Sequence, residues 1–301
     1  MRKEFAAKIN SLFASNQDLV FLTGDLGYNA LEDIQSAYPN RFINAGVAEQ
    51  NMVGLAAGLA YEGHPCFVYS IAPFAVYRAY EQIRLDVCIH NHPVCIVGNG
   101  GGYGYGIMGA THHATKDLAC LSPLPNMICY IPAFAEDVEY CLDQIVERKG
   151  PSYLRLGLGI QYPKAITIGP INQVVQAIDK PALTVITQGP VVKNALKAME
   201  GLENVDLFSI LTLPILTLSP EILNSIALSK RVLVIEEHVE RGGLAEYLLL
   251  QLTRAGLKLD SFEVLNAKGY PSKTYGNQDF HWKESGLDVE NIQQYITKLN
   301  T

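Results

Sequence analysis

The stretch INAGVAEQNMVGLAAGLAY, residues 43–61, joins a short extended segment to a helix built largely from small side chains. We expect the extended segment at residues 41–44 and the helix at residues 49–61, where alanine and leucine favour helix formation. The apolar run CFVYSI follows at residues 66–71. An extended segment, a helix and an apolar strand in this order are typical of a parallel βα unit. The stretch therefore predicts an α/β fold.

The same alternation extends through both halves of the chain. In the first half we expect strands at residues 20–23, 41–44, 66–71, 94–98, 127–131 and 153–156, and helices at residues 49–61, 73–88 and 135–148. In the second half we expect strands at residues 183–187, 205–210, 231–236 and 262–265, and helices at residues 191–202, 220–228 and 243–255. Strands and helices that alternate at this spacing predict two doubly wound domains.

A stretch with several prolines and little periodic pattern separates the two halves. We interpret residues 161–180 as a linker between a domain at residues 1–160 and a smaller α/β domain at residues 181–301. The length of 301 residues is consistent with this division, because a domain usually contains roughly 100–200 residues.

Composition and charge exclude several classes of function. Apolar residues make up 49% of the chain and charged residues 18%, an ordinary globular balance. The net charge of −7 argues against a general surface for nucleic acid or for an anionic membrane. The apolar runs are shorter than the ~20 residues of a membrane span, and the first residues lack the apolar core of a signal peptide. Because the six cysteines match no zinc spacing, we expect a soluble, cytoplasmic protein with reduced thiols.

The sequence NGGGYGYGIMG at residues 99–109 is unusually rich in glycine. It contains a formal G-x-G-x-x-G at Gly104, Gly106 and Gly109, but no acidic residue follows at the distance that a dinucleotide site requires. The absence of G-K-[ST] excludes a P-loop. Two interpretations stay open: a flexible loop between sheet and helix, and a loop whose backbone approaches a ligand.

Two kinds of titratable residue lie beside these segments. His112 and His113 follow the glycine-rich stretch, and they serve either in packing or in proton transfer at a loop–helix junction. Adjacent histidines point in different directions, so they make a poor metal pair. Glu49 lies at the start of an expected helix, where the helix dipole favours a carboxylate. Its small and apolar neighbours equally allow a desolvated carboxyl group that donates a hydrogen bond.

Several motifs follow one another along nearly the whole chain. They are GVAEQNM at 46–52, YSIAPF at 69–74, RAYEQIRLD at 78–86, the glycine-rich stretch, THHA at 111–114, PNM at 125–127 and YLRLG at 153–157, with EEH at 236–238 and GGL at 242–244 in the second half. The first seven resemble the pyrimidine-binding domain of the transketolase family, and the last two resemble its C-terminal domain.

The resemblance implies a thiamine diphosphate enzyme that transfers a two-carbon ketol unit from a ketose to an aldose. A glutamate at the position of Glu49 would bind N1′ of the aminopyrimidine and favour the imino form, which activates the thiazolium carbon. Phe74 would stack on the pyrimidine ring, with Tyr77 as a further neighbour. Asp25 and Leu26, in the turn GDLG, would also lie beside the cofactor.

The substrate side is implied by the same resemblance. His112 would act as a catalytic residue that contacts the substrate, and Arg78 and Arg155 are available for a sugar phosphate, because guanidinium groups match phosphate oxygens. Leu158 stands where we expect a basic residue, and Met108 where deoxyxylulose phosphate synthases have an aspartate. These departures leave open whether the sugar is phosphorylated.

The family also has an upstream domain whose G-D-G…N motif holds the metal and the diphosphate. This sequence contains no G-D-G. The resemblance therefore implies the C-terminal half of a split transketolase, with no metal ligands of its own. We expect an N-terminal partner subunit that carries the diphosphate and Mg²⁺ site, together with self-association in a two-plus-two heterotetramer whose catalytic centres lie at the interfaces.

Three alternatives stay open. They are the β subunit of a 2-oxo-acid dehydrogenase, an enzyme similar to deoxyxylulose phosphate synthase, and a non-catalytic partner subunit. The THHA and RAYEQIR motifs favour a transketolase over the dehydrogenase. The presence of Glu49, Phe74 and His112 together argues against a non-catalytic subunit.

The second half offers little chemistry of its own. Glu237 and His238 end an expected strand, where they form either a polar strand end or a contact across the assembly. Trp282, the single tryptophan, stays unassigned.

Overall fold

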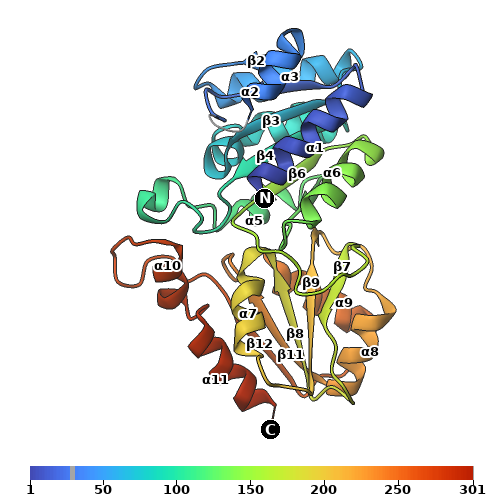
Figure 1. The fold of residues 1–301 in the computed structure, drawn as a ribbon, viewed down its shortest axis with the longest axis vertical. Helices are drawn as coiled ribbons and strands as arrows, with labels where there is room; N and C mark the ends of the chain where they lie inside the picture. Colours follow the sequence, from blue (N-terminus) through green and yellow to red (C-terminus); the bar gives the residue numbers. More distant parts are fainter. Residues whose placement is uncertain (28–30, 301) are drawn as a thin grey trace.

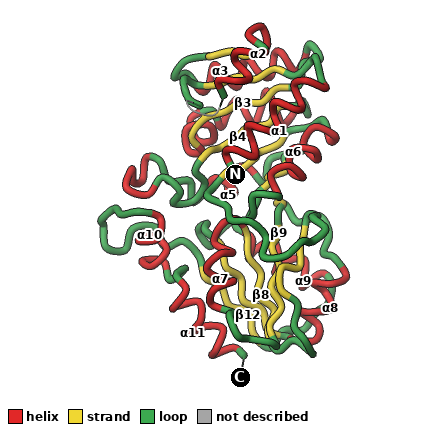
Figure 2. The backbone as a smooth tube through the Cα atoms, viewed as in Figure 1, coloured by secondary structure: helices red, strands yellow, loops and turns green. Residues whose placement is uncertain are grey.

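The computed structural model describes residues 1–27 and 31–300, which form two α/β units arranged end to end (Figure 1). Within these residues, a seven-stranded sheet has the order β10-β5-β6-β4-β3-β1-β2, and a five-stranded sheet has the order β12-β11-β8-β9-β7. Figure 2 shows each sheet in yellow between red helices. The expected α/β fold with two wound sheets is confirmed.

The first sheet consists of parallel strands, except that β10 runs antiparallel to β5. Its strands are β1 (Val20–Thr23), β2 (Phe42–Asn44), β3 (Cys66–Ile71), β4 (Val94–Asn99), β5 (Ile128–Tyr130), β6 (Ser152–Leu156) and β10 (Thr212–Leu213). The helices and turns of this unit are α1 (Arg2–Ser15), α2 (Glu32–Ala37), η1 (Pro39–Arg41), α3 (Glu49–Tyr61), η2 (Phe74–Arg78), α4 (Tyr80–Gln82), η3 (Ile83–Ile89), η4 (Gly106–Thr111), α5 (Asp117–Leu121) and α6 (Asp137–Arg148).

The central strands are apolar throughout because helices cover both faces of the sheet. Successive side chains point to opposite faces, so Phe21 joins the cluster under α1, α2 and α6. Its neighbours Val20 and Leu22 join the cluster under α3 and the segment from η2 to η3. The small residues Ala56 and Ala60 are buried where α3 lies on the sheet.

The second sheet is also parallel, apart from its edge strand β7, which runs antiparallel to β9. Its strands are β7 (Ile171–Val175), β8 (Leu183–Gln188), β9 (Val205–Ile210), β11 (Arg231–Glu236) and β12 (Ser261–Leu265). One face packs on α7 (Val192–Ala198) and α11 (Val289–Leu299), and the other on α8 (Pro220–Ser229) and α9 (Leu244–Arg254). The remaining elements of this unit are the 3₁₀ turn η5 (Gly189–Val191) and the helix α10 (Gln278–Ser285).

Some elements differ from the sequence-based expectations. Residues 73–88 do not form one α-helix, because η2 and η3 are wound as π turns on either side of the short α4. The strand β7 lies within the stretch that we interpreted as a linker. Its sequence INQVV contains two polar residues and follows a proline, so it lacks the apolar run of the other strands, and the pairing with β9 makes it a strand. The helices α1, α2, α5, α10 and α11 were not predicted.

Candidate active site

The carboxyl ends of β1, β3 and β4 lie at one edge of the first sheet, since these strands are parallel neighbours. Asp25 follows β1 and Phe74 follows β3 at this edge. The loop after β4 is residues 99–114, which we call the glycine-rich loop. Glu49 begins α3 after β2. The carboxyl edge is where ligands bind to open parallel sheets, and these positions converge on it.

Glu49 is the first residue of α3, and its side chain is only 4% exposed. The N-cap position is Ala48, which makes no side-chain cap. Both carboxylate oxygens of Glu49 instead accept hydrogen bonds from Nη1 of Arg78, at 3.1 and 3.2 Å. The Glu49 side chain therefore contacts Arg78 and makes no cap for α3, and the hydrogen bonds that it makes with Arg78 are accepted, unlike the donated one that the desolvated interpretation expects.

Phe74 and Arg78 bound the π turn η2, which brings their side chains together. The guanidinium carbon of Arg78 lies 4.0 Å from the centroid of the Phe74 ring, in a cation–π contact. The same guanidinium group donates to Glu49. A flat group with N–H donors therefore fits between the face of Phe74 and the carboxylate of Glu49.

His112 comes from the glycine-rich loop and reaches the same place. Its ring lies edge-on to Phe74, with 5.0 Å between the centroids and 66° between the planes. Its Nδ1 lies 2.8 Å from the Thr111 hydroxyl group. Tyr105 lies on its other side at 5.7 Å between centroids. Glu49, Phe74, Arg78 and His112 thus form one contiguous cluster.

Asp25 and Leu26 line a neighbouring polar pocket at the end of β1, together with Asn44. Asp25 has a left-handed backbone (φ 56°). Two hydrogen bonds with the Asn44 side chain stabilise this conformation. Asn44 accepts from the Asp25 backbone N–H at 3.0 Å and donates to its carboxylate at 3.1 Å. Asn44 also accepts from the backbone N–H of Gly46, just before Glu49. Sequence reasoning missed Asn44, although a polar residue at the carboxyl end of a strand was its visible signal.

Two expected site residues lie elsewhere. The hydroxyl group of Tyr77 accepts from the backbone N–H of Lys116 at 3.2 Å, which directs it toward the start of α5. The Arg155 side chain is 4% exposed and donates to Asp117 at 2.9 Å, to the Ala114 carbonyl at 2.6 Å and to the Glu237 carbonyl at 3.1 Å. Because these acceptors come from both units of the protein, the geometry favours a structural role for Arg155 over the expected substrate contact.

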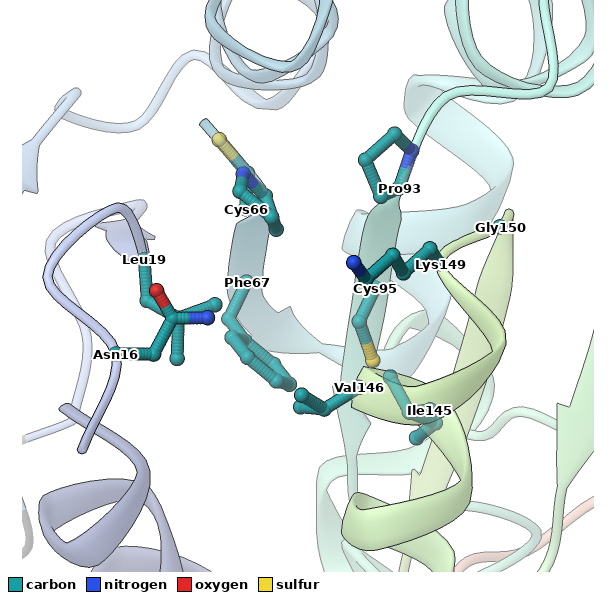
Figure 3. Close-up of a pocket in the computed structure, with 11 residues that line it drawn as sticks. Asn16, Leu19, Cys66, Phe67, Pro93, Cys95, Ile145, Val146, Lys149 and Gly150 are labelled. Carbon is teal, nitrogen blue, oxygen red and sulfur yellow. The ribbon is translucent and has the colours of Figure 1, made fainter. Parts of the chain in front are cut away.

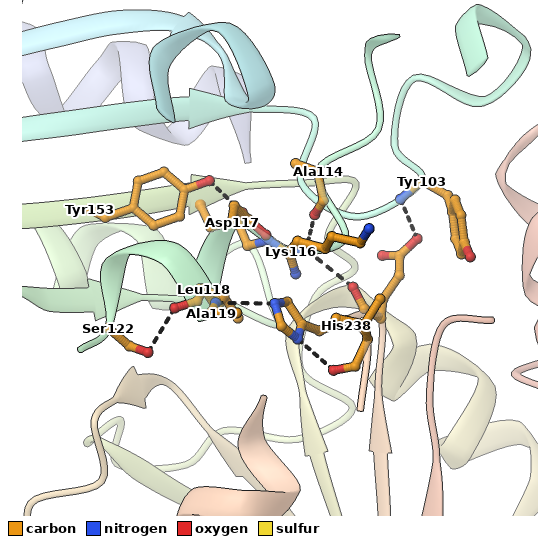
Figure 4. Close-up of polar contacts among 12 residues, drawn as sticks. Tyr103, Ala114, Lys116, Asp117, Leu118, Ala119, Ser122, Tyr153 and His238 are labelled. Atoms are coloured by element: carbon orange, nitrogen blue, oxygen red, sulfur yellow. Dashed lines mark hydrogen bonds and ion pairs between the residues drawn. The ribbon is translucent and has the colours of Figure 1, made fainter. Parts of the chain in front are cut away.

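The acceptor of that contact, Asp117, was not anticipated from the sequence. Its Oδ2 accepts from Arg155 and from the Tyr153 hydroxyl group at 2.6 Å (Figure 4).

His238 lies nearby. The Ala119 backbone donates to Nε2 of His238 at 3.3 Å, and Nδ1 of His238 lies 2.7 Å from the Val239 carbonyl. Burial lowers the pKa of His238 to about 4, so the ring is neutral at pH 7. His238 therefore joins the two units and is not placed among the cluster around Glu49.

A small apolar pocket lies at the opposite edge of the first sheet, where β3 and β4 begin (Figure 3). Leu19, Cys66, Phe67 and Cys95 line it. Burial raises the pKa of Cys66 to about 12, so its thiol group stays protonated and is a poor nucleophile. We assign no chemistry to this pocket.

Residues 1–27 and 31–300 contain no group of three or more His, Cys, Asp or Glu side chains that could hold a metal ion. Across the same described ranges, every helix is too short or too polar to cross a membrane.

Comparisons with known proteins agree with the fold and identify the family of this chain. Residues 1–158 match the family described as transketolase, pyrimidine binding domain. The chain is 29% identical to one subunit of the apulose-4-phosphate transketolase of Phocaeicola vulgatus, over 97% of this chain and 94% of that protein. It is 33% identical to a transketolase C-terminal section of Methanocaldococcus jannaschii, over 98% and 95% of the two chains.

A solved structure of similar length has the same fold. It is described as a split gene transketolase, inactive beta4 tetramer, and it matches with a TM-score of 0.81 and 27% identity over 99% of this chain and 97% of that chain. Longer relatives match only in part. The chain is 31% identical to a 1-deoxy-D-xylulose-5-phosphate synthase of Clostridium perfringens, but it spans only 44% of that protein's length.

Proposed function

This chain belongs to the transketolase family, and on that premise we propose that it is the C-terminal subunit of a split transketolase. With a partner subunit, it would transfer a two-carbon ketol unit from a ketose donor to an aldose acceptor. The observation that carries this proposal concerns Glu49 and Phe74 at the carboxyl edge of the first sheet. Together they contact the flat guanidinium group of Arg78, which donates N–H groups to the carboxylate and lies over the ring. Its relatives of equal length are themselves named as transketolase subunits or sections.

The residues present fit thiamine diphosphate, the cofactor of this family. An aminopyrimidine needs an aromatic face and a carboxyl group opposite a ring nitrogen, and the guanidinium group of Arg78 already makes both kinds of contact. When bound, the cofactor supplies the electron sink for breaking and making the carbon–carbon bond. Phe74 would hold the ring, and Glu49 would hold the proton shared with N1′. Asp25 and Leu26 would border the cofactor, with Tyr77 farther off beside α5.

His112 would face the reacting sugar. Its ring contacts Phe74 from the glycine-rich loop, whereas Glu49 and Arg78 are bonded to each other. A histidine in this place can hold or move a proton at a substrate oxygen. Arg78 is half exposed and borders the same site, so it is also our candidate for contact with an anionic substrate.

A partner subunit would complete the site. We propose that this partner binds the diphosphate and Mg²⁺, and that the assembly is a two-plus-two heterotetramer. The Phocaeicola relative is named as one subunit of a transketolase, which supports the existence of a partner. The split-gene structure, in which the β chain alone is described as an inactive tetramer, supports self-association through this chain.

A phosphorylated sugar is the proposed substrate. The name of the Phocaeicola relative specifies a sugar phosphate. In this chain, Arg2 and Lys3 line a pocket together with Glu4, Asn99 and Tyr105, and the Tyr105 ring lies 5.7 Å from the His112 ring. These positive charges support binding of a phosphate group. A screen of ketose donors with and without phosphate would decide between the two classes of substrate.

The test is calorimetric titration of thiamine diphosphate with Mg²⁺ into this chain, into the candidate N-terminal subunit and into their mixture. We expect tight binding in the mixture alone, followed by ketol transfer in a coupled assay. Tight binding by this chain alone would mean that the diphosphate site is misplaced. A complex that forms, binds the cofactor and transfers no ketol unit would favour the non-catalytic alternative.

A further inference from the structure

The glycine-rich loop lies against the second unit of the protein, beside α10 (Figure 1). At Gly102, which has a φ of +61°, an added Cβ would lie 2.3 Å from the carboxyl carbon of Glu237. At Gly106, which has a φ of +48°, it would lie 3.0 Å from the backbone of Asn277. The glycines therefore let the loop backbone approach the second unit. This contact with a protein surface was not predicted from the sequence.

Glu237 ties the loop to that surface through a single carboxyl group. It directly follows β11 and is 2% exposed. Its Oε1 accepts from the Tyr103 backbone N–H at 2.9 Å, from Nε1 of Trp282 at 2.7 Å and from Nε2 of Gln278 at 2.9 Å. Tyr103 belongs to the loop, whereas Gln278 and Trp282 belong to α10. A buried acceptor with three donors is costly to disturb, so it fixes the beginning of the loop.

A second anchor fixes the end of the loop at His113. Its Nε2 lies 2.7 Å from the Gly106 carbonyl, and its Nδ1 lies 2.8 Å from the Tyr270 hydroxyl group. Because a carbonyl only accepts, Nε2 carries the hydrogen, and the Tyr270 hydroxyl group donates to Nδ1. Burial lowers the pKa of His113 to about 4, so this neutral tautomer persists at pH 7.

His112 lies between these anchors. Its backbone N–H donates to the Gly109 carbonyl at 2.9 Å, and the next residue is the anchored His113. The contact of its ring with Phe74 therefore depends on where the second unit holds the loop. We propose that Glu237 and Tyr270 are positioning residues for His112, so that the second unit controls the geometry of a site to which it contributes no ligand. The consequence for turnover rests on the proposed ketol transfer.

The first test uses this chain alone and needs no turnover. The seven histidines are labelled with ¹⁵N, and the His112 side-chain signals are assigned with a His112→Asn variant. We expect Glu237→Gln and Tyr270→Phe to shift the His112 signals. Glu236→Gln is the matched control, because Glu236 is the buried neighbour in β11 and accepts from the Leu244 and Ala245 backbone without touching the loop. Unmoved His112 signals, or an equal shift in the control, would overturn the proposal.

The second test uses the assembled two-subunit enzyme. Misplacing a catalytic group by about 1 Å can cost about a hundredfold in rate. We expect kcat to fall about tenfold or more in Glu237→Gln and less in Tyr270→Phe, with the Kd for thiamine diphosphate unchanged, because Glu49 and Phe74 lie outside the loop. An unchanged kcat would refute the positioning role. A wild-type complex without ketol transfer would refute the proposed function, while the spectra would still decide whether His112 is positioned.

Discussion

Two of the arginine–carboxylate pairs, Arg78 with Glu49 and Arg155 with Asp117, have contrasting surroundings that suit them to different roles. Arg78 binds Glu49 at the carboxyl edge of the first sheet, with the Arg78 side chain 49% exposed. Arg155 binds Asp117 between the two units, where the two side chains are 4% and 0% exposed. In the first pair a half-exposed arginine contacts a carboxylate that is only 4% exposed, and we propose that this carboxylate also binds the cofactor. The second is desolvated and is held by both units, so it is structural.

Replacing Glu49 tests the functional pair most severely. In the assembled enzyme, Glu49→Gln should lower kcat by about 10²–10⁴-fold, the usual contribution of a positioned proton-transfer group. Single-turnover kinetics with the ketose donor measure this loss.

Glu62→Gln, at the exposed C-cap position of the same helix α3, is the control for this experiment, because it changes another carboxylate on the same unit at the opposite end of the helix. If Glu49→Gln retained more than half of the wild-type turnover, Glu49 would not activate the cofactor.

Breaking the buried pair should have the largest effect on folding. Arg155→Met leaves Asp117 charged and without its partner in the interior, which typically costs about 3–5 kcal/mol. Urea unfolding of the chain measures the loss. The double variant Arg155→Met/Asp117→Asn removes the uncompensated charge and should recover part of the stability. A loss below about 1 kcal/mol in the single variant would contradict the structural role.

A pH series sharpens the description of the buried region. Burial raises the pKa of Glu236 from its ordinary 4.5 to about 7. The hydrogen bonds from the Leu244 and Ala245 backbone N–H groups lower the pKa, but the effect of burial is larger. The folded chain therefore binds the proton more tightly, so this contribution to stability is present below pH 4.5 and is lost as the pH rises through 7. Relative to Glu236→Gln, the wild type should lose on the order of 3 kcal/mol over this range.

The comparison with Glu236→Gln also cancels the opposite effects of His113 and His238, whose pKa values are both lowered by burial. Unfolding free energies at pH 5 and pH 8 are sufficient. Parallel pH curves for the two proteins would show that Glu236 does not titrate in this range.

The smallest effect is expected at the exposed pair. Arg78→Met should change the free energy of unfolding by no more than about 1 kcal/mol, because a half-exposed ion pair contributes little and its removal admits water to Glu49. The same urea experiment, run beside Arg155→Met, measures the difference between the pairs. Equal losses in the two variants would remove the distinction between a functional and a structural arginine.

Local patterns explain why much of the fold could be predicted. The helix at residues 49–61 and the strand at residues 66–71 agree with α3 and β3 residue for residue. Their apolar content and their length follow from burial on both faces of a parallel sheet. The edge strands β7 and β10 were missed because β7 includes the polar residues Asn172 and Gln173 and β10 has only two residues, so their partners β9 and β5 define them.

The site residues likewise divide into those that local patterns predicted and those whose role depends on distant partners. The sequence placed Glu49, Phe74 and His112 in the loops and helix starts that follow parallel strands, and the geometry of strand ends brings such positions to one edge. It could not separate Arg78 from Arg155, since both looked available for a phosphate group. Burial and partners distinguish them, and these depend on residues such as Asp117 and Ala114 that are distant in the chain from Arg155.

The sequence by itself determined the α/β fold, the family and the motifs of the site, because these depend on periodicity and on ordered local motifs. The tertiary structure decided what the glycine-rich loop contacts and what Glu237, His238 and Trp282 do. Their partners lie more than a hundred residues away along the chain or in another element, as in the bond from Tyr103 to Glu237. No local pattern encodes such contacts, since they arise only when the chain folds: Trp282 meets Glu237 within the second unit, and Tyr103 meets Glu237 when the two units pack together.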